Sequence, residues 1–115
     1  MRRGDVYLVD LEPVRGNESN KVRPAVLVSN DAANRAAERL GHGVVTIVPV
    51  TSNVERVMPF QVRLPAGAGG LAAASKAQAE QVRSVASERL RRRLGALEPD
   101  VLRRVDDALR LHLSL

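Results

Sequence analysis

The fold is decided by a run of β-branched residues near the middle of the chain, Gly43-Val44-Val45-Thr46-Ile47-Val48-Pro49-Val50-Thr51. Branching at Cβ costs side-chain freedom in a helix but suits a pleated surface, so the run predicts a strand. Pro49 has no backbone N–H to give to a ladder, and it therefore indicates a bulge or a sheet edge.

Other β-rich stretches lie on both sides of this run. They predict strands over residues 5–11, 22–29, 60–64 and 77–86, the last two from alternation with a period of two. Residues 15–21 contain no apolar side chain, and they predict a polar loop between the first two strands.

Helices are predicted by their end signals. Asn30 and Asp31 are good N-cap residues before the Ala-rich stretch 32–40, and Gly41 follows it as a C-terminal cap. Ser87 predicts the start of a second short helix over residues 88–94.

The C-terminal segment predicts an amphipathic helix that begins at Pro99. Its apolar residues recur with helical spacing on one side: Val101, Leu102, Val105, Ala108, Leu109 and Leu113. We therefore expect a single α+β domain over residues 1–115. Its architecture would be a small β-barrel or sheet with short helices and this C-terminal helix packed on it.

Composition removes several classes of function. The 115 residues include no Cys and two His, which excludes disulfide scaffolds, thiol nucleophiles and a three-histidine metal site. We expect no cofactor. No apolar run is long enough to cross a membrane, and the N-terminus has no signal-peptide core, so we expect a cytoplasmic protein. The net charge of +5 favours a polyanionic partner.

Some chemical motifs have simpler explanations. His42 and His112 could form the imidazole pair of a ribonuclease, but they lie on separate predicted elements. Asp106 and Asp107 point apart on a helix and are expected on its solvated surface. Residues 67–70 are read as a flexible loop. The arginine run 89–93 is either a phosphate patch or a set of cations at a helix C-terminus.

A more promising group of polar residues is spread along the chain at expected strand ends. Arg23 begins the second strand directly after the loop that contains Glu18, and Thr51 and Ser52 end the third. Gln81 and Arg83 would share one face of a later strand. Because a strand end can present side chains to a cleft, all of these residues could converge on one site.

These residues belong to phrases that occur in order along the chain. They are Arg3-Gly4-Asp5-Val6-Tyr7, Gly16-Asn17-Glu18, Arg23-Pro24-Ala25-Val26-Leu27-Val28-Ser29-Asn30-Asp31, Val48-Pro49-Val50-Thr51-Ser52 and Glu80-Gln81-Val82-Arg83-Ser84-Val85. Together they resemble the MazF/PemK family of toxins from toxin–antitoxin systems.

The resemblance implies an SH3-like barrel that forms a homodimer. It implies an mRNA interferase, a metal-independent endoribonuclease that cuts single-stranded RNA at a short sequence. It also implies a cognate antitoxin whose acidic, disordered segment occupies the RNA groove.

Site residues follow from the resemblance position by position. The catalytic residues would be Arg23, Thr51 and the loop acid Glu18. The implied RNA-binding positions are Asn30, Ser52, Ser75, Gln81 and Arg83. The loop around Glu18 and residues 66–74 depart from the family pattern, so base preference is not implied.

Two other classes of function remain open. A CcdB-like toxin, which inhibits gyrase, would bind a protein target and cut nothing. A non-catalytic RNA-binding barrel would use the positive charge without forming a product. Cleavage of RNA by the protein alone separates both from the ribonuclease.

Overall fold

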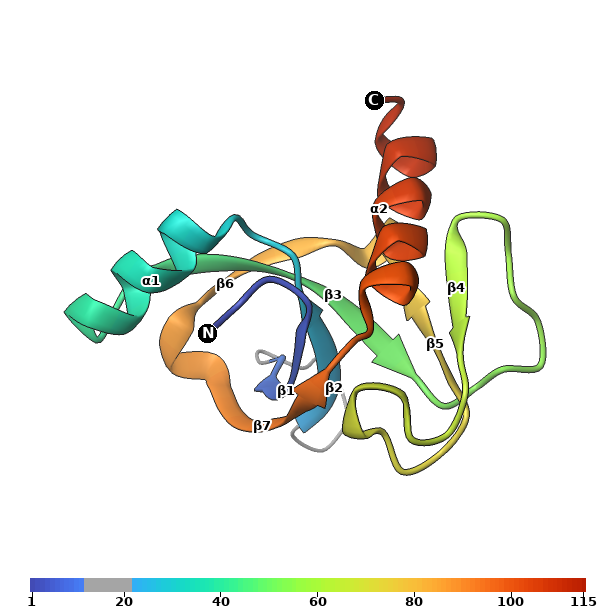
Figure 1. The fold of residues 1–115 in the computed structure, drawn as a ribbon, viewed down its shortest axis with the longest axis horizontal. Coiled ribbons are helices and arrows are strands. Elements are labelled where there is room, and N and C mark those ends of the chain that lie inside the picture. Colours follow the sequence, from blue (N-terminus) through green and yellow to red (C-terminus); the bar gives the residue numbers. More distant parts are fainter. Residues whose placement is uncertain (12–21) are drawn as a thin grey trace, which may run out of the picture.

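The computed structural model describes residues 1–11 and 22–115, and within them it forms one antiparallel seven-stranded sheet and two α-helices. The expected α+β class is confirmed, while the closed barrel stays a prediction. The sheet order is β4-β5-β3-β2-β1-β7, and β6 pairs with β3 off this path (Figure 1). The strands are β1 (Asp5–Asp10), β2 (Val22–Leu27), β3 (Val44–Thr51), β4 (Gln61–Leu64), β5 (Ser75–Gln78), β6 (Arg83–Ala86) and β7 (Leu90–Ala96).

Strand β3 is the centre of the sheet. On one side residues 47–49 pair with β2, and on the other residues 44–47 pair with β6. The pairing with β5 then begins at Val50. Pro49 lies where β3 leaves β6 and has not yet met β5, so the missing N–H falls in a gap between two partners.

Helix α1 (Asp31–Leu40) has the end signals that its sequence predicts. The Asn30 side chain accepts a hydrogen bond from the Ala33 N–H at 2.8 Å, which satisfies one N-terminal donor. Gly41 ends the helix with a positive φ of 75°, and its N–H donates to the Ala37 carbonyl.

Helix α2 (Pro99–Leu113) also begins as predicted, with proline in its first turn. Val105 and Ala108 are buried, and the helix packs against β4 and the turn after β5 (Figure 1). Apolar side chains near the C-terminus of the chain are not buried: Leu111, Leu113 and Leu115 are 57, 48 and 84% exposed. In the described part of the chain, no helix has the length and apolar character needed to span a membrane.

The core is aliphatic and divides into two clusters. One lies under α2 and includes Val48, Leu64 and Val105, all fully buried. The other lies toward α1 and includes Leu27, Ile47 and the helix residue Ala37. The sheet is therefore covered by a helix at each cluster.

The helix expected over residues 88–94 is wrong. The chain makes a short 3₁₀ turn at Ser87–Arg89 and then continues as strand β7, which pairs with β1. Arg91 and Arg93, two apart on this strand, reach the buried carboxylates of Asp10 at 3.0 Å and Asp5 at 3.3 Å. These ion pairs and the open edge of β1 outweigh the helix propensity of Leu, Arg and Glu.

The single strand expected over residues 77–86 is two strands. β5 ends at Gln78, a 3₁₀ turn covers Ala79–Gln81, and β6 begins at Arg83. The turn lets the chain leave one end of β3 and return to pair with its other end.

The loop over residues 67–70 is packed against the sheet, which corrects the expectation of a flexible segment. Ala68–Gly70 form a 3₁₀ turn beside β7 and β1. A Cβ at Gly69 would lie 2.5 Å from Val6 Cγ2, and one at Gly70 would collide with the Leu94 carbonyl oxygen. Glycine is required here because the turn approaches the strands so closely.

Candidate functional site

A polar hollow of about 390 Å³ opens where β2, β3, the turn after β5 and the start of β6 meet. Four residues singled out from the sequence converge on it, which makes it the candidate functional site. Its lining residues are Leu11, Arg23, Pro49, Thr51, Gln78, Gln81 and Arg83.

Strand register places the two central side chains. The pairing of β2 with β3 ends at Ala25 and Pro49. Arg23 lies two residues from Ala25 on β2 and Thr51 two residues from Pro49 on β3, and both line the hollow. Arg83 approaches from the other side of β3, where it pairs with Ile47.

The hollow is positively charged. Arg23 and Arg83 contribute guanidinium groups, and the lining residues that belong to the described part of the chain include no acid. Within the described residues, neither guanidinium makes a hydrogen bond or an ion pair. Both cations are therefore available to an anionic ligand, and guanidinium can bind phosphate oxygens in a bidentate manner.

Thr51 keeps its hydroxyl proton available. Its Oγ1 accepts a hydrogen bond from the Asn53 N–H at 3.2 Å, which shapes the turn that follows β3. A hydroxyl has one donor as well as its acceptor sites, so Thr51 can still donate into the hollow.

The turn after β5 contributes a pair of amides, of which sequence reasoning found one. Gln78 directly precedes the 3₁₀ turn and Gln81 ends it. Both side chains line the hollow. Leu11, Pro49 and Gln78 were missed, and the only available signal for Gln78 was its spacing from Gln81.

Ser52 and Glu18 are not placed in the hollow. Ser52 follows Thr51 directly and is exposed, but it is not among the lining residues. Glu18 lies outside the described residues.

Asn30 and Ser75 have local structural partners. Asn30 follows the far end of β2 from Arg23, roughly 20 Å along an extended chain, and caps α1. Ser75 is 4% exposed and donates its hydroxyl to the Ala73 carbonyl at 2.8 Å. Neither lines the hollow.

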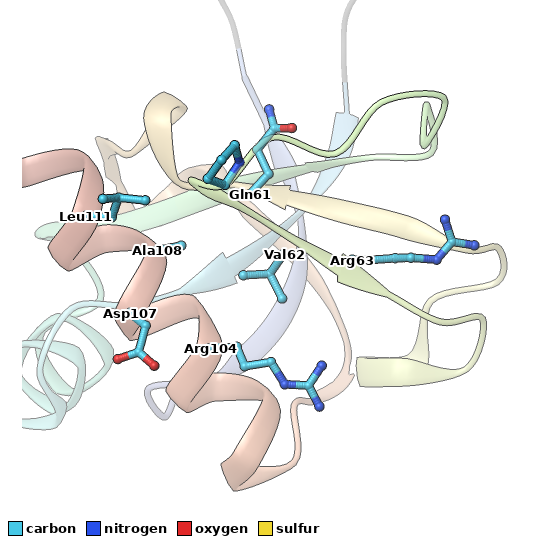
Figure 2. Close-up of a pocket in the computed structure, with 8 residues that line it drawn as sticks. Gln61, Val62, Arg63, Arg104, Asp107, Ala108 and Leu111 are labelled. Carbon is cyan, nitrogen blue, oxygen red and sulfur yellow. The ribbon is translucent and has the colours of Figure 1, made fainter.

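A second hollow, of about 380 Å³, lies between β4 and α2, as Figure 2 shows. Val62, Ala108 and Leu111 supply apolar surface, while Arg63 and Arg104 extend from its rim (Figure 2). Asp107 lines it, but none of the described residues that the family resemblance implies for the site does. We therefore place the candidate site in the hollow that holds Arg23.

The remaining polar candidates have partners elsewhere. Asp106 is not simply solvated, because its carboxylate pairs with both terminal nitrogens of Arg3, the longer contact being 3.3 Å. The His112 ring lies 6.3 Å from that of Phe60. Within residues 1–11 and 22–115, no group of three or more His, Asp and Glu side chains is placed to hold a metal ion.

Residues 2–113 match the model of the PemK-like, MazF-like toxins of type II toxin–antitoxin systems. The chain belongs to this family. The MazF-like toxin is 57% identical to "Endoribonuclease MazF9" of Mycobacterium tuberculosis over 115 residues, which cover all of this chain and 98% of that protein.

Solved structures agree with this MazF-like fold. A mycobacterial endoribonuclease in complex with its cognate antitoxin superposes with a TM-score of 0.79 at 25% identity, covering 100% of this chain and 96% of that one. A MazE–MazF complex from Deinococcus radiodurans gives 0.79 at 28% identity with the same coverage.

Proposed function

We propose that this chain, a MazF-type endoribonuclease, cuts single-stranded RNA at a short sequence in the hollow that holds Arg23 and Thr51. The RNA's own 2′-OH attacks the adjacent phosphorus, and the P–O5′ bond breaks. The products are a 2′,3′-cyclic phosphate and a 5′-OH end. The convergence of Arg23, Thr51, Gln81 and Arg83 on one cationic hollow carries this proposal.

Arg23 stabilises the transition state. Negative charge builds on the non-bridging phosphoryl oxygens as the 2′-oxygen adds to phosphorus. The guanidinium is permanently charged and is not engaged by another described residue, so it can bind two such oxygens at once. Preorganised donors of this kind contribute most where charge develops.

Thr51 acts beside Arg23 on the same phosphoryl group. Its hydroxyl donates a hydrogen bond to a non-bridging oxygen, while its own position is fixed by the Asn53 N–H. A neutral donor of this kind contributes less than the cation, because it adds no net charge.

Two proton transfers complete the reaction. The 2′-OH loses a proton as the new P–O bond forms, and the departing 5′-oxygen gains one. No histidine lines the hollow. We assign the base that accepts the 2′-OH proton to Glu18 or to water. A water molecule beside Arg23 donates the proton that the departing 5′-oxygen gains. The nucleophile belongs to the RNA, so no metal-activated water is needed, and DNA is not cut because it lacks the 2′-OH.

RNA is held by the rest of the hollow. Arg83 contacts a phosphate, and Gln81 and Ser52 contact the nucleotide beside the cut. Asn30 and Ser75, which lie away from the hollow, remain predictions from the family resemblance alone.

Two different surfaces suggest the partners. An acidic, disordered segment of a cognate antitoxin covers the cationic hollow and competes with RNA, as suits a family of toxin–antitoxin systems. A homodimer covers the exposed leucines at the end of α2, Leu111, Leu113 and Leu115. Action on mRNA places the protein in the cytoplasm.

The test is the chemistry of the product ends. A long RNA of defined sequence is incubated with the protein in excess EDTA, and the new ends are sequenced with and without prior phosphorylation. We expect discrete cuts whose 5′ ends require a kinase before ligation. Ends that carry 5′-phosphate would contradict attack by the 2′-OH, and intact RNA would favour a protein-binding toxin or a binding module.

A further inference from the structure

We propose that Gln78 and Gln81 together read one RNA base beside the scissile phosphate, and that Gln78 determines which base is accepted. This inference rests on the proposed ribonuclease function and deepens it, because it assigns part of the sequence specificity to the turn between β5 and β6.

The first observation is placement. Gln78 is flanked by Ala77 and Ala79, each 1% exposed, so alternation along the chain turns its side chain away from the core. Gln81 ends the 3₁₀ turn that follows and is exposed. Both amides line the hollow with Arg23 and Thr51.

The second observation is that the turn is held rigidly. The Val82 N–H donates to the Ala79 carbonyl at 3.1 Å and closes it. Behind it, Gln61 Nε2 donates to Glu80 Oε2 at 2.8 Å, and Gln61 Oε1 accepts from the Met58 N–H at 2.9 Å. These bonds tie the turn to β4 and to the loop before it.

The third observation is chemical contrast within the hollow. Arg23 and Arg83 are cations suited to phosphate, whereas the two amides are neutral and each offers a donor pair and an acceptor. Within the described residues, neither Gln78 nor Gln81 makes a side-chain hydrogen bond. An amide can bond to a donor and an acceptor on one base edge, which is how single-stranded RNA is read.

A change of side-chain chemistry at residue 78 should therefore change which base is accepted. Glu at residue 78 keeps the shape of Gln but replaces the NH₂ donor by an acceptor. A base that accepted a hydrogen bond from the Gln78 NH₂ group is then rejected, and a base that donates a hydrogen bond at this place is favoured. Leu keeps the bulk and loses both interactions.

The experiment maps all cleavage sites of the wild type, Gln78→Glu and Gln78→Leu on one RNA of random sequence in EDTA. Ala32→Glu is the matched control, since it adds the same charge at an exposed position of α1 outside the hollow. Circular dichroism and the melting temperature show whether each variant is folded.

We expect Gln78→Leu to lose roughly 5- to 150-fold of the preference at one position of the motif. Gln78→Glu should shift that position to another base, and Ala32→Glu should keep the wild-type motif. An unchanged motif in both Gln78 variants, or an equal loss at every site, would overturn the inference while leaving the ribonuclease intact. A folded wild type that cuts no RNA would overturn the proposed function as well.

Discussion

Arg23 on β2 and Thr51 on β3 each lie two residues from the pair Ala25 and Pro49, at which the pairing of the two strands ends. The two side chains line the same hollow, although each strand contributes mostly core residues. The strands that build the core thus also place a cation and a hydroxyl at one end of the sheet. The preorganisation that the proposed reaction needs comes from strand pairing rather than from a flexible loop.

Thr51 offers a graded test of this arrangement. We expect Thr51→Val to slow RNA cleavage about tenfold or more, because it removes the hydroxyl but keeps the β-branched shape. Thr51→Ser retains the hydroxyl and should stay within a few-fold of the wild type. Single-turnover cleavage rates measure both, and equal rates for Val and Ser would assign Thr51 a purely structural role.

The packed glycine turn gives a prediction about stability. Gly67 and Gly70 both have positive φ, of 94 and 80°, but only Gly70 has backbone atoms where a Cβ would stand. Gly67→Ala should cost about 1 kcal/mol of the free energy of unfolding from backbone strain alone. Gly70→Ala should cost about 1–3 kcal/mol more, because the turn must move away from Leu94. Urea unfolding measures the free energy of unfolding of both variants. Equal losses would show that the close approach of Gly70 to Leu94 adds no cost.

Tyr7 should ionise above its ordinary pKa of 10.0, because its burial and then the negative charge of Asp5 disfavour the phenolate. A raised folded pKa stabilises the fold fully below pH 10.0, and this contribution is lost as the pH rises through the folded value. The chain has one Tyr and no Trp, so tyrosinate absorbance reports this group alone. Asp5→Asn should move the midpoint back toward the ordinary value. A wild-type midpoint at or below the ordinary value would contradict the assignment.

Asp31 gives the opposite pH dependence at the start of α1. The backbone N–H of Arg3 donates to its carboxylate at 2.7 Å, and this bond lowers the pKa of Asp31 below 3.8. A lowered folded pKa stabilises the fold above 3.8, and the contribution disappears as the pH falls through the folded value. The stability difference between the wild type and Asp31→Asn should therefore shrink in acid. A difference that stays constant from neutral to acid pH would show that the bond is not charge-dependent.

Local sequence signals correctly predicted the helices whose ends carry capping residues or a proline. Asn30 and Gly41 cap α1, and Pro99 opens α2, because such residues satisfy or remove terminal backbone groups wherever the helix lies. Residues 88–94 carry equally good helix formers, yet they form the end of a 3₁₀ turn and most of β7. The deciding partners, Asp5 and Asp10, are far away in sequence, so local propensity could not reveal them.

The candidate site was predictable in its residues and not in its geometry. Arg23, Thr51, Gln81 and Arg83 stood out at expected strand ends or through family resemblance. Their convergence depends on strand register and on a 3₁₀ turn that alternation of residues 77–86 had concealed. Gln78 was missed because it shows its role only once that turn is placed.

The most direct test of the central claim compares Arg23→Ala with Arg92→Ala in excess EDTA on one RNA that the wild type cuts. Arg92 is an exposed arginine of β7 and lies outside the hollow, so its variant controls for the loss of one positive charge. The account predicts that Arg23→Ala slows cleavage by about 10²- to 10³-fold while remaining folded, and that Arg92→Ala cuts near the wild-type rate. A folded Arg23→Ala protein that cleaves as fast as Arg92→Ala would contradict it.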